Sequence, residues 1–223
     1  MKDNHNLNWP GWRLEDNPHG KEFDKEARQR MLEGSNKLEP FIQKYKNKMG
    51  KDILEIGPFF NPLITAEKFP NTSICYWEND YHVLKHHIKE SIGKPVHPIH
   101  CDLNLIEGDS FLKLKLETQK LFKEGIHFDS IVISHVFNYV DYKMLLIILK
   151  DFLKKNGLIF INNVVDYGIP AFFSDKKPSS VASTVKAIKE TGYKIIEKEI
   201  QESPYKEYQK NKRLIVVAKN VYL

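Results

Sequence analysis

The feature that most restricts the fold of this chain is a series of short apolar runs separated by longer stretches of helical spacing. Short apolar runs bounded by turn residues are typical of parallel strands that are buried on both faces. Because each crossover helix must cover a face of the sheet, this alternation predicts a doubly wound, mostly parallel α/β sheet. We expect its first five strands at residues 52–56 (DILEI), 73–77 (SICYW), 96–100 (VHPIH), 130–134 (SIVIS) and 158–162 (LIFIN).

The stretches between and around these runs predict helices. Residues 21–48 carry apolar side chains at helical spacings and predict two helices before the first strand. Residues 142–154 (YKMLLIILKDFLK) predict an amphipathic helix with a C-cap signal at Asn156 and Gly157. A further helix is expected over residues 181–190.

The end of the chain departs from the plain nucleotide-binding pattern. Two strands are expected at residues 193–200 and 213–219, joined by a polar segment that contains Pro204. Since no helix joins them, we expect them to be antiparallel neighbours, with the last strand antiparallel to the rest of a seven-stranded Rossmann-like sheet. The 223 residues then divide into an N-terminal helical arm, 1–50, and one α/β domain, 51–223.

Composition removes several classes of function. The net charge of +5 is spread along the chain, which makes a nucleic-acid partner unlikely and leaves an anionic small substrate open. No apolar run approaches the roughly 20 residues of a membrane span, and the N-terminus lacks a signal-peptide pattern, so we expect a cytoplasmic protein. Cys75 and Cys101 lie in strand-like contexts and are expected to be reduced apolar side chains. We expect no metal, and the oligomeric state stays open between monomer and homodimer.

Ligands of doubly wound sheets bind over the carboxyl ends of the strands, beside the first strand. The first strand contains Glu55 and ends at Gly57 and Pro58. The glycine permits a tight turn and close approach of a ligand to the backbone. A plain strand-to-loop turn is the alternative, but an acid inside an apolar strand is costly to bury without a partner.

The second strand ends in an acid about twenty residues further on, at Glu78, followed by Asn79 and Asp80. In nucleotide-binding α/β folds an acid at this place accepts hydrogen bonds from a ribose diol. The alternative is a surface acid that caps the next helix, and Asp80 suits that role before residues 81–88.

Four sequence segments between about Lys51 and Lys219 resemble, in their order along the chain, motifs of the class I S-adenosylmethionine-dependent methyltransferases. ILEIGPFFNP is similar to the family's first motif, WEND to the acidic end of its second strand, and HCDL to its adenine-side station. FDSIVISHVFNYV followed by LKDFLKKNGLIFINN is similar to its fourth strand, helix and fifth strand. The closing pair of strands also suits this family.

The resemblance implies S-adenosylmethionine as cofactor and a methyltransferase activity. Carried over residue by residue, it puts Glu55, Gly57 and Pro58 near the methionine part, Glu78 and Asn79 at the ribose, Asp102 and Leu103 at the adenine, and Ser134 and His135 near the sulfonium. The first motif departs from the family at Phe59 and Asn61, where the common form has glycines. Phe59 removes the small residue that lets the backbone approach the ligand.

Methyl transfer from a sulfonium needs alignment above all, and a base if the acceptor is a hydroxyl. Candidate bases are His135, Asp166, Tyr167 and His19. By the absence of a nucleobase-methylating motif or a cluster of metal ligands, we expect a small-molecule acceptor. The leading expected reaction is O-methylation of a sugar-linked or phosphate-bearing compound, for example in surface-polysaccharide biosynthesis.

Two alternatives stay open. An NAD-dependent oxidoreductase shares the fold and the acid after the second strand, but it usually needs the GxGxxG pattern, which is missing here. A non-catalytic S-adenosylmethionine-binding regulatory protein is the other alternative, and Phe59 is the feature that favours it.

Overall fold

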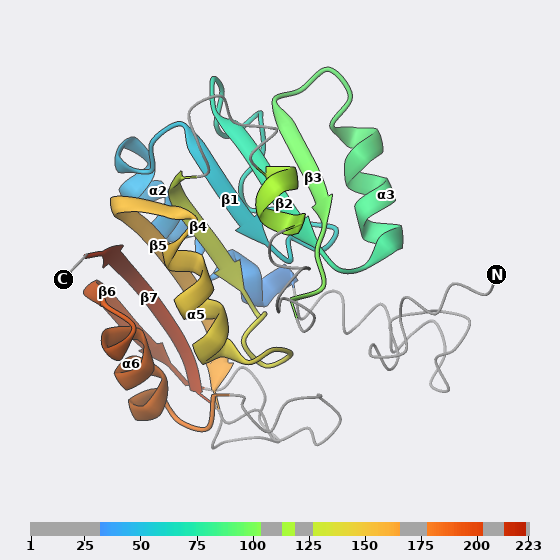
Figure 1. Cartoon of the computed structure of the whole chain (residues 1–223). Helices are drawn as coiled ribbons and strands as arrows, with labels where there is room; N and C mark the ends of the chain where they lie inside the picture. Colours follow the sequence, from blue (N-terminus) through green and yellow to red (C-terminus); the bar gives the residue numbers. More distant parts are fainter. Residues whose placement is uncertain (1–31, 104–112, 119–126, 166–177, 203–211, 222–223) are drawn as a thin grey trace, which may run out of the picture.

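Seven strands of the computed structural model, which describes residues 32–103, 113–118, 127–165, 178–202 and 212–221, form one sheet (Figure 1). Their order across the sheet is β3-β2-β1-β4-β5-β7-β6. The strands are β1 (Asp52–Ile56), β2 (Ser73–Glu78), β3 (Val96–His100), β4 (Phe128–Ser134), β5 (Leu153–Val165), β6 (Tyr193–Gln201) and β7 (Lys212–Asn220). All seven coincide with predicted strands. β1 and β3 have the predicted bounds, and the largest difference is at β5, which begins five residues before and ends three residues after the predicted 158–162.

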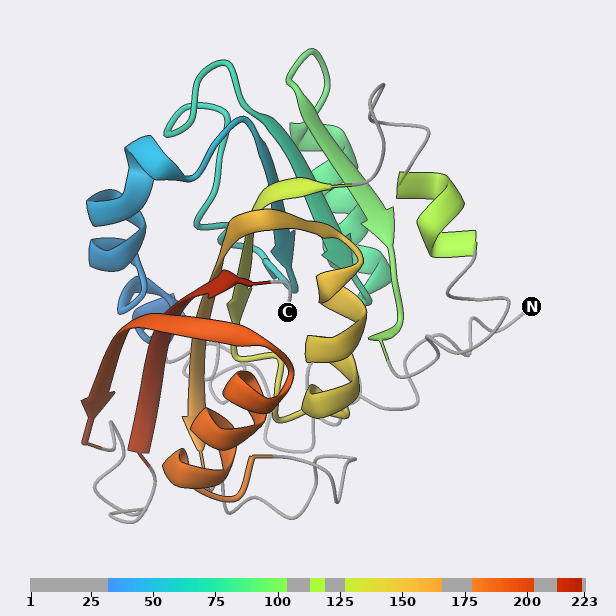
Figure 2. The same cartoon turned by 60° about the vertical axis from the view of Figure 1, so that its left-hand side comes forward.

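Helices cover both faces of this sheet. They are α2 (Glu39–Tyr45), continued by the 3-10 turn η1 (Lys46–Lys48), α3 (Tyr81–Glu90), α5 (Tyr142–Lys150) and α6 (Val181–Glu190). Figures 1 and 2 show α5 and α6 on one face and α2 on the other. Apolar side chains form a separate core on each side: Leu146 and Ile188 belong to one, and Phe41 and Ile42 to the other. The doubly wound arrangement predicted from the sequence is thereby confirmed.

The strand pairing fixes where a ligand can bind. β1 pairs in parallel with both β2 and β4, so the order of strands reverses beside β1. β7 pairs antiparallel with β5 and with β6, as the non-helical connection between the last two strands predicts. The carboxyl ends of β1, β2, β3 and β4 therefore meet at one edge, on either side of the reversal.

The helix predicted at residues 142–154 is confirmed over 142–150, and the prediction is wrong for its last four residues, 151–154. α5 ends at Lys150, and β5 already begins at Leu153. The Phe152 carbonyl accepts from the Phe128 backbone N–H (2.7 Å) and the Leu153 carbonyl from the Asn220 side chain (2.8 Å). These partners come from strands far away in the sequence, so the local helical pattern gives way to the sheet. The positive φ of 66° at Asn156 lies inside β5, within an irregularity of its pairing with β4.

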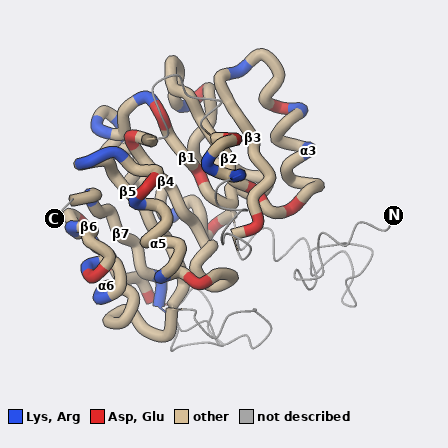
Figure 3. Tube along the Cα trace, in the orientation of Figure 1, with Lys and Arg blue, Asp and Glu red and all other residues tan. Residues whose placement is uncertain are grey.

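Basic and acidic residues are both spread over the described part of the chain, although α5 and β7 carry Lys or Arg and no Asp or Glu. Figure 3 shows Lys and Arg positions interspersed with Asp and Glu along the helices and strands. Among the described residues, no helix has the length and apolar character that crossing a membrane requires. Cys75 and Cys101 are free and buried, as predicted.

Candidate functional site

The residues that sequence analysis selected from four strands meet at the carboxyl edge of the sheet. Ile56 pairs with Trp77 of β2 and Ile133 of β4, so Gly57, Glu78 and Ser134 follow at the same level. The Gly57 N–H donates to the Trp77 carbonyl at 2.8 Å, which ties the first loop to β2. Gly57 has a φ of 61°, and a Cβ there would lie 2.9 Å from Val136 Cγ2. A glycine is therefore needed where the chain leaves β1.

Glu78 is a buried acid at the end of β2. Its side chain is 3% exposed, and its carboxylate accepts from two backbone amides, Phe59 (3.1 Å) and Asp80 (2.9 Å). Burial raises the pKa of Glu78 to about 7, against the effect of these hydrogen bonds. Each carboxylate oxygen can accept a second hydrogen bond, which is the chemistry that a ribose diol requires.

Glu55 has the same burial but different partners. Its two oxygens accept from the Leu63 and Ile64 amides, both at 2.9 Å, so it holds the far end of the loop that follows β1. The Tyr76 hydroxyl donates to the Ile64 carbonyl and fixes the same end. Burial raises the pKa of Glu55 to about 7. The acid in the first strand thus has the buried partners that its position demands.

A pH dependence follows from the raised pKa of Glu55. A carboxyl whose pKa is about 7 in the folded chain, against an ordinary 4.5, binds its proton more tightly when folded. Its contribution to stability is complete below about pH 4.5 and is lost as the pH rises through about 7. Glu55→Gln removes this titration. As the pH rises over this range, the free energy of unfolding of the unmodified chain should therefore fall relative to that of the variant. The relative change is on the order of 3 kcal/mol, at about 1.4 kcal/mol per pKa unit.

Urea unfolding of both proteins at several pH values between about 5 and 8 measures this difference. The comparison at each pH is needed because burial lowers the pKa values of His87 and His135, which makes stability rise with pH in the same range. A constant difference between the two proteins from pH 5 to 8 would contradict the raised pKa of Glu55.

The residues around Glu78 and β3 complete the half of the edge that β2 and β3 form. Asp80 is the N-cap of α3 and accepts from the His82 (2.7 Å) and Val83 (3.2 Å) amides, so the capping role considered for it is confirmed. The Asn79 carbonyl accepts from His100 Nε2 at 3.0 Å. Two further predicted residues, Asp102 and Leu103, are half-buried directly after β3.

The other half of the edge is a polar cluster that sequence analysis found only in part. Asn162 of β5 donates to the Gly34 carbonyl (2.8 Å) and to Ser134 Oγ (3.1 Å). Arg213 of β7 is 2% exposed and donates to the same carbonyl (3.2 Å) and to Asn162 Oδ1 (2.9 Å). We call Gly34, Ser134, His135, Asn162 and Arg213 the β4–β5–β7 cluster.

His135 adopts a φ of 62° in this cluster, and its Nε2 lies 3.2 Å from Arg213 Nη1. An arginine nitrogen can only donate, so this contact favours a neutral imidazole with its lone pair on Nε2. Removal of the ring from water, together with the nearby Arg213 charge, lowers the pKa of His135 to about 3. His135 is therefore neutral at pH 7.

Two polar residues in this cluster gave a signal that the sequence analysis did not use. Asn162 and Asn163 interrupt an apolar strand, and polar groups in such runs need buried partners. Arg213 directly precedes the apolar run LIVVA, which forms the buried part of β7. Gly34 gave no such signal. The predicted residues His19, Asp166 and Tyr167 lie outside the described residues.

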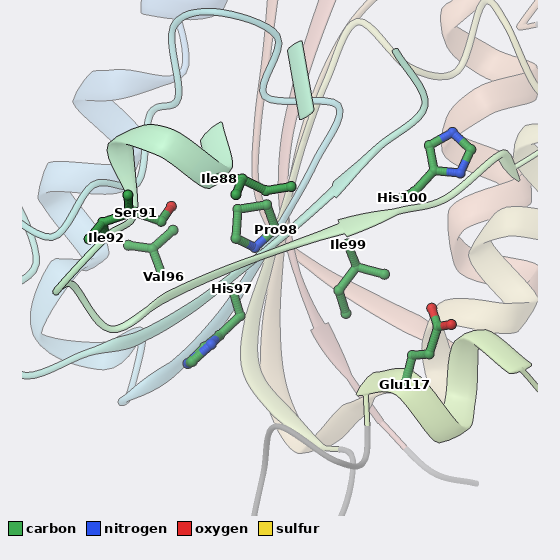
Figure 4. A pocket seen from close by; sticks show the side chains of 9 residues that line it. All are labelled: Ile88, Ser91, Ile92, Val96, His97, Pro98, Ile99, His100 and Glu117. Carbon is green, nitrogen blue, oxygen red and sulfur yellow. The ribbon is translucent and has the colours of Figure 1, made fainter. Parts of the chain in front are cut away.

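An open hollow of about 550 Å³ lies elsewhere, along the outer edge strand β3 (Figure 4). Its lining is mostly apolar and comes from the end of α3, from β3 and from Glu117. Within the described ranges, its lining includes none of the predicted site residues. The predicted site residues of β1, β2 and β4 lie at the carboxyl edge instead.

Comparison with known proteins rests on structure. No family model and no curated protein sequence matches the chain. Among solved structures, an S-adenosylmethionine-dependent methyltransferase from Mesorhizobium loti is similar, with a TM-score of 0.60, 15% identity, and coverage of 81% of this chain and 96% of that one. A toxoflavin N1-methyltransferase from Burkholderia thailandensis, bound to S-adenosylhomocysteine, has a TM-score of 0.62 at 9% identity, covering 89% and 84%.

The chain has the class I methyltransferase fold. This confirms the resemblance drawn from the four segments and the predicted place of the last strand. The methyltransferase fold by itself does not fix a reaction. The [4+2]-cyclase SpnF is also similar, with a TM-score of 0.62 at 10% identity, covering 84% of this chain and 81% of its own.

Proposed function

We propose that this chain binds S-adenosylmethionine across the tips of β1, β2, β3 and β4 and transfers its methyl group to a small molecule. The observation that carries the proposal is Glu78. It is a buried carboxylate at the tip of β2, beside the positive-φ turn at Gly57, on the side of β1 where the strand order reverses. Both oxygens retain the capacity to accept from a ribose diol.

The other residues have proposed places around the same ligand. Glu78 and Asn79 hold the ribose, and Asp102 and Leu103 flank the adenine. Gly57, with Pro58 and the loop that Glu55 holds, lies against the methionine part. Ser134 and His135 face the sulfonium end. When bound, the cofactor supplies an electrophilic methyl group, and the residues of the chain align the acceptor with it.

The proposed acceptor is a small molecule, and O-methylation of a sugar-linked or phosphate-bearing compound is the specific reaction that we propose, for example in surface-polysaccharide biosynthesis. The basic balance of the chain, +5, supports an anionic acceptor. A hydroxyl acceptor needs a base. Because the pKa of His135 is lowered to about 3, it is a weak base, and Asp166, Tyr167 and His19 are the stronger proposals.

A second candidate function is binding without methyl transfer. Phe59 in the first motif favours it, since a side chain replaces the glycine of the common form.

Calorimetric titration with S-adenosylmethionine, S-adenosylhomocysteine and NAD separates the candidates. We expect both sulfur nucleosides to bind and NAD not to bind. Binding of NAD alone would contradict the proposal and favour an oxidoreductase.

Transfer is tested separately. The purified chain is incubated with methyl-labelled S-adenosylmethionine and a panel of hydroxylated sugars, sugar phosphates and small amines. Label transferred to an acceptor supports methyl transfer, and its position identifies the atom methylated. Tight binding with no transfer to any acceptor would favour the non-catalytic function.

A further inference from the structure

Phe59 keeps the backbone conformation of a glycine although it carries a large side chain. Its φ is 51°, in the left-handed region that residues with a Cβ rarely adopt. Its ring is 9% exposed and packs edge-on against Phe60, with the ring centroids 4.9 Å apart. The loop after β1 thus has a turn suited to glycine at a position where the sequence has none, and something must hold it there.

Two buried side chains hold the Phe59 peptide groups from opposite sides. The Phe59 N–H donates to Glu78 Oε2 at 3.1 Å. Its carbonyl accepts from His87 Nε2 at 2.5 Å, and His87 is 3% exposed. A carbonyl can only accept, so His87 carries its proton on Nε2. Burial lowers the pKa of His87 to about 4, which keeps the ring neutral near pH 7.

These contacts form a closed path that returns to Glu78. The second oxygen of Glu78 accepts from the Asp80 amide at 2.9 Å. Asp80 caps the start of α3, and the same helix carries His87. The His87 ring is held in turn by Tyr76 of β2, with ring centroids 5.0 Å apart. We call Glu78, Phe59 and His87 the Phe59 clamp.

We propose that His87 is a positioning residue for the nucleoside. By donating to the Phe59 carbonyl, it keeps the Phe59 N–H hydrogen-bonded to Glu78, and this orients the Glu78 carboxylate toward the ribose diol. This inference rests on the proposed function. It explains how a first motif without the second glycine still supports a ribose site, because the clamp supplies what the glycine supplies elsewhere. A plainer role for His87 is to fill the core between α3 and β2, and the test must separate the two.

The test is a double-mutant cycle read by calorimetric binding of S-adenosylhomocysteine. His87→Leu removes the donor at similar volume, and His87→Gln keeps a donor. Phe59→Gly gives a residue that adopts positive φ without steric cost and does not need the hydrogen bond from His87. We expect His87→Leu to raise the Kd about tenfold and His87→Gln less than about threefold. The Kd of Phe59→Gly, measured separately, is the reference for the second half of the cycle.

The decisive comparison is His87→Leu in the Phe59→Gly background, where we expect a change of less than about twofold. An equal loss of affinity in both backgrounds, or no loss in either, would overturn the inference and leave His87 as a core residue. If His87→Leu does not fold, as urea unfolding will show, His87→Met, which also lacks an N–H donor, replaces it in both backgrounds. Failure of the unmodified chain to bind the nucleoside would instead refute the proposed function.

Discussion

Glu78→Gln is expected to raise the Kd for S-adenosylhomocysteine between about 10-fold and 100-fold. A ribose diol offers two donors, and a carboxylate can accept both, whereas an amide has one accepting oxygen. Hydrogen bonds to a charged group contribute about 1.5–3 kcal/mol each, which corresponds to this range. Isothermal titration calorimetry of the two proteins at about pH 8, above the Glu78 pKa of about 7, measures the change.

Glu55→Gln is the matched control for this substitution. Both acids are 3% exposed, both accept from two backbone amides, and burial raises the pKa of each to about 7. Either glutamine turns an amide NH₂ toward a backbone donor, so the two variants should lose comparable stability. Only Glu78→Gln should lose most of the affinity. An equal loss of affinity in both variants would mean that the loop after β1, and not a ribose contact, sets binding.

Gly50→Ala is expected to destabilise the fold by about 3 kcal/mol or more without altering the nucleoside site. Gly50 has a φ of 77°, and a methyl group there would overlap the Asp129 side chain. Asp129 Oδ2 accepts from the Lys51 (2.8 Å) and Asp52 (3.0 Å) amides, and its Oδ1 pairs with Lys154 (2.9 Å). Moving Asp129 therefore breaks the contacts that begin β1. Loss of a charged hydrogen-bond acceptor adds to about 1–2 kcal/mol of backbone strain.

Gly93→Ala isolates the strain from the overlap. Its φ of 76° is nearly the same, but a methyl group there would meet no atom of the described residues within 4 Å. We expect it to cost only about 1–2 kcal/mol in urea unfolding. Equal losses for the two alanine variants would contradict the role given to Asp129. Since Gly50 precedes β1, at the amino end, folded Gly50→Ala should bind the nucleoside as the unmodified chain does.

Local patterns were sufficient to predict most of the sheet. Each apolar run between Asp52 and Asn162 became a strand, and the non-helical link before β7 predicted its antiparallel pairing. The boundary between α5 and β5 was not predictable, because Asn220 and Phe128 determine it through the sheet. Periodicity describes neighbours in sequence and contains no information about such partners.

The candidate site divides in the same way. The acid at position 78 and the cap at Asp80 follow from their places at the end of a strand and the start of a helix. The partners of Phe59 could not be predicted, since the donor to its carbonyl is His87 on α3, 28 residues later. Arg213 and Gly34 meet across 179 positions of sequence. Sequence analysis identified which strand ends bear polar groups, but the contacts that orient them depend on the tertiary fold.

A crystal structure of the chain with S-adenosylhomocysteine tests the central claim most directly. We predict that both ribose hydroxyls lie within about 3 Å of the Glu78 carboxylate oxygens, with the adenine beside Asp102 and Leu103 and the sulfur toward Ser134. A nucleoside bound away from the tips of β1 and β2, or bound there with no contact to Glu78, would contradict it.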